Sequence, residues 1–533
     1  MPRSEGSDVT AVELEHPRLS LSPKGVIYTI TSLINEIVSF IYRFVQHCIA
    51  FVFAPSLPPP QDQRNAAYGH VAVIGAGVSG VSTAAHLIGN GFLVTLYDDS
   101  PAKAPGGVWA RVNKTSGLQL NSMLYRFFPA VIWSKAYPHR DEVVGEVEKV
   151  WTRYGLDACT RWEKVTKVER HHSDKKGERS RWIINGDQTT VFDAVFATIG
   201  TCGAPKRIDV KNLERWRGKV AHSSQLDDLD LEGKRVIVLG SGASGVEAAE
   251  TALANNAKHV TVLARSDKWI IPRNFVVDTL LALQPLGRQT PLSFIPEWLL
   301  RTFHYRDLQD ISPYKKGVYA GTPIVNNSFL EHIRQGRVTY ARGDLIDVMG
   351  DGVKFSYRPR ESKAGDEGDL KTIRGDVFVL ATGFERPSLD FLPKDLFPKE
   401  SDKLHDYAPP NLYLQVFSTE DWSICLTNAA YKDAIATVGH VHIGIYARIL
   451  MTFLKHPETA PSPASMKLWV DVIRWIKETA PAGSFEFFTF AELTIWFLGF
   501  HLLKLSRLPY FMFVLNGLGG GWPRASKQAI KTG

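Results

Sequence analysis

Short apolar runs and helical patterns alternate along most of this chain. Twice, a run of four apolar residues typical of a buried strand leads into a glycine-rich turn and then into apolar positions at helical spacing. The two copies are VAVIGAGVSG, residues 71–80, and VIVLGSGASG, residues 236–245. Two more apolar strands, FDAVFATIG (192–200) and GDVFVLATG (375–383), each end in Ala-Thr and a glycine. The pattern predicts an α/β fold with two strand-turn-helix units, one inserted in the other.

Both turns read G-x-G-x-x-G, and their glycines are Gly75, Gly77 and Gly80 in the first and Gly240, Gly242 and Gly245 in the second. The spacing has a physical reason. The first glycine makes the tight turn, the second lets the backbone approach a pyrophosphate, and the third packs the helix against the strand. The helix N-terminus then receives the negative charge. We therefore expect two doubly wound, Rossmann-like dinucleotide-binding domains, rather than glycines that serve packing alone.

The strand that follows each turn distinguishes the two sites. The first such strand ends in Asp98 and Asp99, and Asp98 lies 23 residues after Gly75, where a carboxylate accepts hydrogen bonds from a ribose diol. The second ends in Ala264 and Arg265, followed by Ser266. A guanidinium at that position can grip a 2′-phosphate, which a carboxylate would repel. The first site therefore suits FAD or NAD, and the second suits NADPH, with Ser266 beside its phosphate.

The N-terminal region has a different pattern. Residues 26–54 are apolar enough for a membrane, but polar residues recur along them at spacings that form one stripe on a helix: Ser32, Glu36, Ser39, Arg43 and Gln46. The stripe favours an amphipathic helix that lies on a membrane or docks on the protein over a helix that spans the bilayer. A second apolar region, 485–515, is consistent with a buried helical hairpin and equally with a membrane-contacting patch.

These signals predict the order of the domains. We expect a disordered tail over 1–25, an amphipathic membrane-associating helix over 26–54, a Pro-rich linker over 55–69, a FAD-binding domain over 70–215 and 376–455 with an NADPH-binding domain over 216–375 inserted in it, and a C-terminal apolar helical extension over 456–533.

Composition and charge limit the classes of partner and site that we expect for this chain. The 533 residues carry a net charge of +7, spread along the chain without a Lys/Arg block, so we expect no nucleic acid partner. The four cysteines, Cys48, Cys159, Cys202 and Cys425, are far apart and form no C-x-x-C, which argues against a redox dithiol and a metal site. Buried, reduced thiols in a cytoplasmic protein are the favoured interpretation.

Several ordered motifs between and around the turns resemble one family. They are GGVW (106–109), LQLNS (118–122), ATIG (197–200), WRGKVAHSS (216–224), WIIPR (269–273) and ATGF (381–384). With the two turns and Arg265, the chain over residues 68 to 455 resembles the flavin-containing monooxygenases, which include N- and S-oxygenases and Baeyer–Villiger relatives. The resemblance implies FAD contacts at Gly107, Trp109 and Gly383, and it places Asn121 beside the reactive edge of the flavin as the catalytic residue.

The same resemblance implies the reaction. NADPH would reduce FAD, and O2 would add to give a flavin C4a-hydroperoxide that transfers one oxygen atom to a small molecule, by N- or S-oxygenation or Baeyer–Villiger oxidation. The family's F-x-G-x-x-x-H segment, which continues to an aromatic residue, reads here Trp216, Gly218, His222 and then Leu226. Leu226 weakens the Baeyer–Villiger assignment, and a structural role is expected for His222 more than a role as base.

Two alternative functions remain open at this point: an NADPH-dependent flavoprotein reductase or oxidase on the same fold, and a catalytically silent nucleotide-binding protein at a membrane. Residues 275–319 are aromatic and apolar, so they predict either a cavity for a lipophilic substrate or ordinary packing. We expect the chain on the cytoplasmic face of an intracellular membrane, peripheral or single-pass, and otherwise in the cytoplasm.

Overall fold

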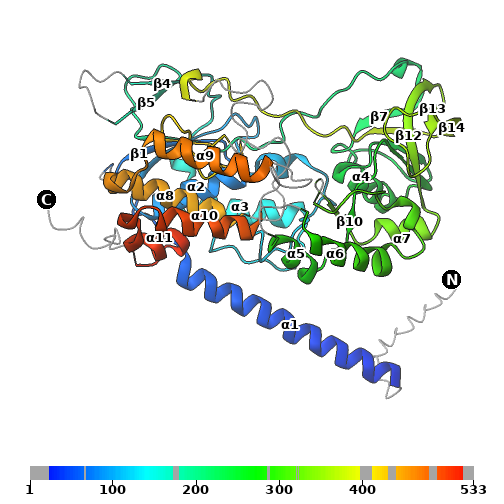
Figure 1. Cartoon of the computed structure of the whole chain (residues 1–533), viewed down its shortest axis with the longest axis horizontal. Helices are drawn as coiled ribbons and strands as arrows, with labels where there is room; N and C mark the ends of the chain where they lie inside the picture. Colours follow the sequence, from blue (N-terminus) through cyan, green and yellow to red (C-terminus); the bar gives the residue numbers. More distant parts are fainter. Residues whose placement is uncertain are drawn as a thin grey trace, which may run out of the picture.

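The computed structural model describes residues 23–519, except 65, 67, 172–178, 285–288, 320, 322, 397–410, 430–439 and 479–488. The tail is predicted over residues 1–25, and residues 1–22 lie outside the described residues. The long N-terminal helix α1 (Pro23–Phe53) begins three residues before residue 26, where the sequence predicts its start. Figure 1 shows two α/β units side by side, with α1 leaving the first of them.

The first unit is built on a parallel sheet of five strands in the order β16-β6-β1-β2-β3. Its strands are β1 (His70–Ile74), β2 (Leu93–Tyr97), β3 (Thr160–Arg161), β6 (Ala194–Ala197) and β16 (Ile424–Cys425). The helices that pack with it are α2 (Val78–Gly89), α3 (Arg140–Arg153) and α8 (His442–Lys455). A small antiparallel pair, β4 (Val168–Arg170) and β5 (Trp182–Ile184), lies at its edge.

The second unit contains a seven-stranded mixed sheet in the order β14-β13-β12-β9-β8-β15-β7. Its strands are β7 (Lys219–His222), β8 (Arg235–Leu239), β9 (His259–Ala264), β12 (Val338–Met349), β13 (Gly352–Tyr357), β14 (Asp369–Arg374) and β15 (Val377–Leu380). The last three strands at one edge, β12 to β14, are antiparallel, and the others run parallel. The unit also contains α4 (Ala243–Ala254) and α7 (Phe329–Arg334).

Sheet pairing confirms the fold class and the insertion. Strands β6 and β16 pair in the first sheet, although the whole second sheet lies between them in the sequence. The predicted boundary at residue 375 is wrong by several residues. Strand β15, placed in the returning FAD segment, hydrogen-bonds β8 and β7 instead. It completes the sheet of the second unit because a parallel strand there buries both of its faces.

The C-terminal segment is not a separate extension. It forms α9 (Pro463–Glu478), α10 (Phe490–Leu502) and α11 (Phe511–Asn516). Trp496, Phe500 and Phe513 belong to the same apolar core as Val71 and Val73 of β1. The predicted hairpin alternative therefore describes the buried face of α10 and α11. Exposed leucines lie on α10 and in the segment that joins it to α11: Leu498, Leu502, Leu503, Leu505 and Leu508.

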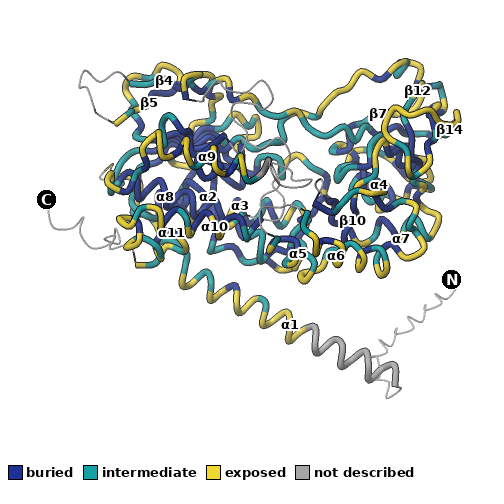
Figure 2. The backbone as a smooth tube through the Cα atoms, in the orientation of Figure 1, coloured by how far each residue is buried: buried dark blue, intermediate teal, exposed yellow. Residues whose placement is uncertain are grey.

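Helix α1 contacts the first unit through Tyr42 and Gln46. Gln46 is fully buried, and its side chain donates to the Trp133 carbonyl and accepts from Arg126 and from the Trp133 amide. Tyr42 hydrogen-bonds Ser122. Figure 2 shows most of the rest of the described helix as exposed, and residues 36–53 are long and apolar enough to cross a membrane. One end of the polar stripe thus docks on the protein.

Candidate functional site

The first glycine turn has the geometry of an anion site. Gly75 has a φ of +105°, which favours glycine, and a Cβ on Gly80 would stand 1.7 Å from the Gly75 carbonyl oxygen. Helix α2 therefore packs directly on the turn. The residue before α2 is Gly77, and no side chain caps the helix. The first N–H groups of α2 are thus left for a ligand, as a pyrophosphate requires.

The glycine pair of GGVW lies against this turn. A Cβ on Gly107 would be 2.9 Å from the Gly77 Cα, so Gly107 has no room for a side chain. The Gly106 N–H donates to the Ala76 carbonyl at 3.0 Å. Trp109 donates its indole N–H to the Tyr125 hydroxyl at 3.1 Å. The structure thus brings two predicted segments, 30 residues apart, to one place.

Asp98 lies at the end of β2 and faces the turn. Its Oδ2 accepts from the Ala76 N–H at 2.6 Å and its Oδ1 from the Ser100 N–H at 2.8 Å. Burial raises the pKa of this carboxyl, and the two hydrogen bonds partly offset that effect. Asp99 is exposed. Of the acidic pair, Asp98 is therefore the carboxylate held at the nucleotide turn.

The second turn repeats this geometry. Gly240 has a φ of +115°, and a Cβ on Gly245 would stand 2.0 Å from the Gly240 carbonyl oxygen. Gly242 precedes α4, which again has no side-chain cap. The Lys268 ammonium lies 4.0 Å from where a Gly242 Cβ would be. The sequence prediction missed Lys268, although a lysine three residues after Arg265 is visible in ARSDKW.

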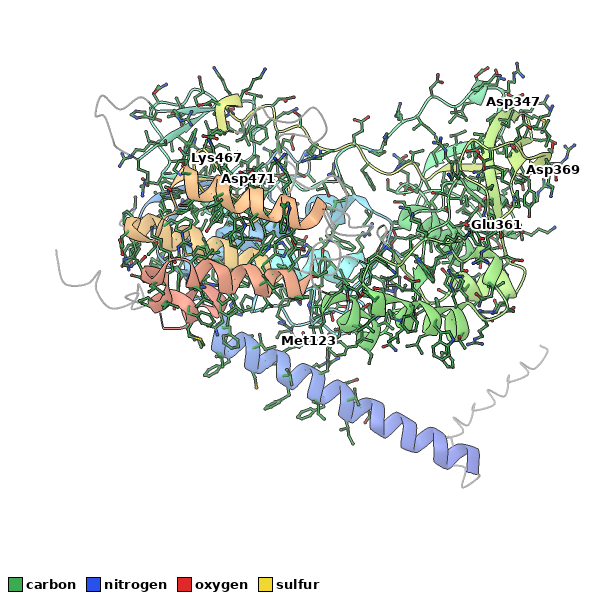
Figure 3. All side chains as sticks on the ribbon, viewed as in Figure 1. Met123, Asp347, Glu361, Asp369, Lys467 and Asp471 are labelled. Carbon is green, nitrogen blue, oxygen red and sulfur yellow. The ribbon has the colours of Figure 1, made fainter. Side chains whose placement is uncertain are left out.

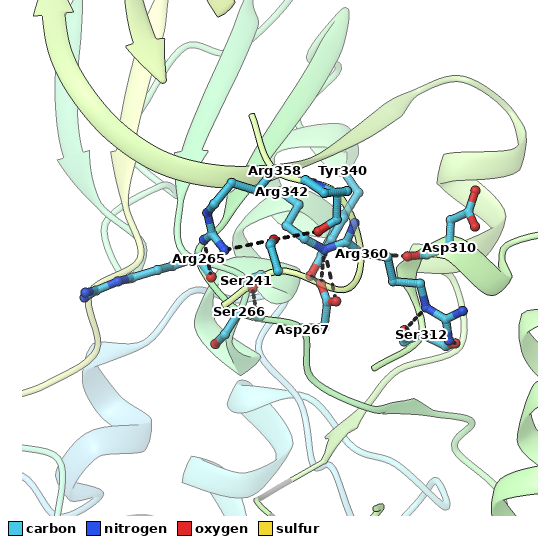
Figure 4. Close-up of polar contacts among 12 residues, drawn as sticks. Ser241, Arg265, Ser266, Asp267, Asp310, Ser312, Tyr340, Arg342, Arg358 and Arg360 are labelled. Atoms are coloured by element: carbon cyan, nitrogen blue, oxygen red, sulfur yellow. Dashed lines mark hydrogen bonds and ion pairs between the residues drawn. The ribbon is translucent and has the colours of Figure 1, made fainter. Parts of the chain in front are cut away.

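Arg265 extends from the end of β9 toward solvent. Its side chain is 79% exposed, and its Nε lies 3.4 Å from Asp344 Oδ1. The other oxygen of Asp344 pairs with Arg358 at 2.9 Å, so Arg358 neutralises much of that carboxylate. The Arg358 guanidinium also donates to the Arg265 carbonyl at 2.7 Å. Figure 4 shows Arg265 pointing away from this cluster, in an orientation that leaves its guanidinium available to a phosphate.

The loop after β9 is fixed by a buried ion pair. Arg342 and Asp267 meet at 3.0 Å with side chains 8% and 7% exposed, and the Tyr340 hydroxyl donates to Asp267 at 2.9 Å (Figure 4). The Ser266 carbonyl accepts from the Ser241 hydroxyl in the second turn at 3.1 Å. Arg265 and Ser266 are therefore presented on a rigid base beside the turn.

Asn121 lies where the two units meet and is 6% exposed. Its main-chain N–H donates to Asp278 Oδ2 at 3.1 Å, from helix α5 (Phe275–Ala282) of the second unit. The Tyr137 hydroxyl donates to the same oxygen at 2.9 Å. The sequence prediction missed Asp278 and Tyr137. Their contacts with each other and with Asn121 join distant parts of the chain, and no local pattern marks them.

Further contacts join the segment before Asn121 to the second unit. The Asn113 side chain donates to the Ser223 carbonyl at 2.7 Å and accepts from the Leu226 N–H at 3.0 Å. The hydroxyls of Thr115 and Thr251 are 2.6 Å apart. Residues 113–121 thus form a seam between the units.

His222 connects the linker to the strand end at Gly383. Its Nε2 donates to the Gly383 carbonyl at 2.9 Å, and its Nδ1 lies 2.8 Å from the Ser224 hydroxyl. Burial lowers its pKa. Both ring nitrogens are engaged in the fold, which supports the structural interpretation of His222 over a role as base.

In the part of the chain that the structure describes, we find no cluster of metal ligands and no disulfide. No three His, Cys, Asp or Glu side chains there lie close enough to hold a metal ion. All four cysteines are free; Cys48 is exposed on α1, so the expectation of buried thiols is wrong for that residue, and Cys425 is buried.

Comparison with known proteins agrees with this architecture. Residues 69–276 match the family model of the pyridine nucleotide-disulphide oxidoreductases. An uncharacterized monooxygenase of Sinorhizobium fredii is 30% identical over 366 residues, which cover 59% of this chain and 53% of the relative. A Baeyer–Villiger monooxygenase of Pseudomonas aeruginosa is 32% identical over 213 residues, covering 38% of each chain. The chain thus spans about half of the first relative's length and little over a third of the second's.

Solved structures share the fold. An OTEMO structure with FAD and NADP has a TM-score of 0.60 at 16% identity and covers 86% of this chain and 99% of its own. An oxidized steroid monooxygenase bound to NADP has a TM-score of 0.57 at 18% identity and covers 84% and 98%. At these identities the likeness shows the fold alone.

Proposed function

We propose that the chain is a flavin-dependent monooxygenase that binds FAD at the first turn and NADPH at the second, and its matches to a pyridine nucleotide oxidoreductase model and to monooxygenases support this. With O2, it would insert one oxygen atom into a lipophilic small molecule. One observation supports this most directly. Two uncapped helix N-termini carry opposite charges beside them, Asp98 at the first and Arg265 with Lys268 at the second.

The residues fit both dinucleotides. The absence of side chains at Gly77 and Gly107 leaves room for a pyrophosphate and for a flat ring above it. Asp98 would accept from a ribose diol, and Arg265 would grip a 2′-phosphate. Bound FAD would supply the redox chemistry, carrying electrons from NADPH to O2. Asn121 is buried at the meeting of the two units, so its side-chain amide can donate a hydrogen bond there while the surrounding protein excludes water.

The experiment is to load the purified chain with FAD, supply NADPH and 18O-labelled O2, and analyse the products of a panel of lipophilic amines, sulfides and ketones. One labelled oxygen atom in a product and NADPH consumption that depends on substrate would support the proposal. NADPH consumption that yields only H2O2 or a reduced acceptor would establish the reductase or oxidase instead. A chain that binds no FAD would refute both.

A pair of variants tests the first site. Asp98→Asn removes the charge of a carboxylate held at the turn, whereas Asp99→Asn changes an exposed neighbour. We expect Asp98→Asn to weaken FAD retention about tenfold or more, because charge-assisted hydrogen bonds contribute about 1.5–3 kcal/mol. Asp99→Asn should retain FAD as the parent chain does. Equal retention by both variants would contradict the assignment.

We also propose that the chain lies on the cytoplasmic face of an intracellular membrane, which would supply the lipophilic substrate. Helix α1 exposes apolar side chains over its described length, among them Phe40, Phe44 and Phe51 at 69%, 59% and 91%. Figure 1 shows α5, α6 (Phe294–Leu299), α10 and α11 on the side of the body from which α1 leaves. These helices expose Phe275, Phe294, Trp298, Leu502 and Met512. An apolar surface of this extent is typical of monotopic membrane contact. Free cysteines are consistent with a reducing compartment.

Vesicle flotation tests this surface. The full chain is mixed with vesicles of neutral and anionic phospholipid, and the floating fraction is measured. Phe40→Ser with Phe44→Ser should lower that fraction at least threefold, since each exposed ring contributes apolar area. The control is Leu370→Ser, an equally exposed apolar residue at 73% on β14 of the second unit. Flotation that neither change affects would refute the membrane proposal.

A further inference from the structure

Asp278 closes a ring of hydrogen bonds around Asn121. Its side chain is buried, at 1% exposed. One oxygen, Oδ2, accepts from the Asn121 main-chain N–H and from the Tyr137 hydroxyl. The Asn121 side chain in turn hydrogen-bonds Tyr137. Both the main chain and the side-chain amide of Asn121 are therefore held, directly or through one phenol, by a carboxylate that belongs to the other unit.

The rest of the surroundings add to this constraint. The Asn121 Oδ1 accepts from the Met123 N–H at 3.0 Å, which leaves the amide little freedom to rotate. Met123, labelled in Figure 3, lies on the side of the body where α1 leaves it. The second oxygen of Asp278, Oδ1, is buried and has no hydrogen-bond partner among the described residues. An unsatisfied buried carboxylate oxygen costs stability, so this position invites a functional explanation.

The charge on this carboxyl is sensitive to pH. Burial raises the pKa of Asp278 to about 6, and the hydrogen bonds from Tyr137 and Asn121 act in the opposite direction. Burial and the charge of Asp278 raise the pKa of Tyr137, while Arg273, just before α5, lowers it. Among the described residues, Tyr137 and Arg273 are the titratable and charged groups that act on the ring.

We propose that Asp278 is a positioning residue for Asn121, holding its amide in one orientation where the two dinucleotide sites converge. The ring itself is a property of this fold, whereas the catalytic consequence rests on the proposed function. Loss of the carboxylate would release Asn121 and Tyr137 together and leave two buried donors without an acceptor. Less oxygen would then reach the substrate, and more of the electrons supplied by NADPH would reduce O2 to H2O2.

Hydrogen exchange in the chain without added cofactors tests the ring by itself. In Asp278→Ala, the peptide that covers residues 119–126 should exchange at least threefold faster than in the parent chain. Asp278→Asn keeps an acceptor, so its exchange should stay close to that of the parent. Glu361→Ala, which removes an exposed carboxylate from the same unit, is the control. Should Asp278→Ala fail to fold, Tyr137→Phe removes one donor and should give a smaller increase. Unchanged exchange in every foldable variant would overturn the proposal.

The FAD-loaded enzyme tests the consequence. At pH 7.5 the ratio of H2O2 formed to NADPH consumed should rise at least threefold in Asp278→Ala and to a smaller extent in Asp278→Asn, whose neutral amide accepts more weakly than the carboxylate of the parent. In the parent, protonation of Asp278 weakens its hydrogen bonds, so the ratio should rise as the pH falls through about 6. Asp278→Asn should lack this pH dependence. Faster exchange with an unchanged ratio would overturn the positioning role. Failure of the parent chain to take up FAD would instead refute the proposed function, and the exchange experiment would still decide the ring.

Discussion

Arg265 provides the sharpest test of the NADPH assignment. Its guanidinium stands at the end of β9, 79% exposed, and Asp344 lies 3.4 Å from its Nε. A charge-assisted hydrogen bond contributes about 1.5–3 kcal/mol, and the high exposure of Arg265 favours the lower limit, about 1.5 kcal/mol. About 1.4 kcal/mol corresponds to a factor of ten. Arg265→Ala should therefore lower the ratio of kcat/KM for NADPH to that for NADH about tenfold.

Lys268 gives the matched comparison. Its ammonium lies beside Gly242, where the pyrophosphate shared by both cofactors would bind. Lys268→Ala should lower kcat/KM for NADPH and NADH by similar factors and leave their ratio unchanged. Titration calorimetry with 2′,5′-ADP and 5′-AMP measures the same difference without turnover. If Arg265→Ala left both the kinetic ratio and the preference for 2′,5′-ADP intact, the reasoning about this strand end would be wrong.

Three further changes test the fold around the site. Gly80→Ala places a Cβ 1.7 Å from the Gly75 carbonyl, so it should cost about 3 kcal/mol in urea unfolding and abolish FAD retention, whereas Gly145→Ala, with no heavy atom within 4 Å in α3, should be neutral or stabilising. Glu247 of α4 has its pKa raised to about 7 by burial, so the folded state holds its proton more tightly than the unfolded state and stability falls as pH rises from about 4.5 to about 7. Glu247→Gln should remove that fall and raise the free energy of unfolding at pH 8 by about 1–3 kcal/mol, and an unchanged pH profile of stability would contradict it. Gln46→Ala removes the partner of the Trp133 N–H and carbonyl and one partner of Arg126, so it should cost about 1–3 kcal/mol and speed proteolysis of α1, unlike Arg43→Ala on the exposed face of the same helix.

The glycine turns could be predicted because their requirements are local. Gly80 must lack a side chain since the Gly75 carbonyl lies five residues before it, and the same holds for Gly245 and Gly240. The positions of Asp98 and Arg265 could be predicted in the same way, because each residue directly follows the strand that comes after a glycine turn. The boundary near residue 375 could not be placed this way, because FDAVFATIG and GDVFVLATG look alike and only hydrogen bonding shows which sheet each strand joins.

Asp278 and Tyr137 show the other limit. The bond from Asn121 to Asp278 joins residues 157 apart, and the bond from Tyr137 to Asp278 joins residues 141 apart. In the sequence, Asp278 is one acidic residue in the apolar run FVVDTLLA, and such a residue usually lies on the solvent face of a helix. It is buried here because α5 packs against the other unit. Contacts between inserted domains carry no periodic signal, so a single sequence cannot mark them.

The segment from Asn113 to Arg126 belongs to the first unit and contacts both the second unit and helix α1. Asn113 and Thr115 bind it to the second unit, and Asp278 holds its centre at Asn121. On the other side, Ser122 and Arg126 receive Tyr42 and Gln46 of α1. Asn121 and Ser122 are adjacent, so a displacement of α1 at a membrane and a displacement of the second unit act on the same peptide. We therefore expect Gln46→Ala to raise the H2O2 to NADPH ratio as Asp278→Ala does, although α1 contributes no residue to either nucleotide turn. A ratio unchanged by Gln46→Ala in a folded, FAD-loaded chain would show that the two contacts are independent.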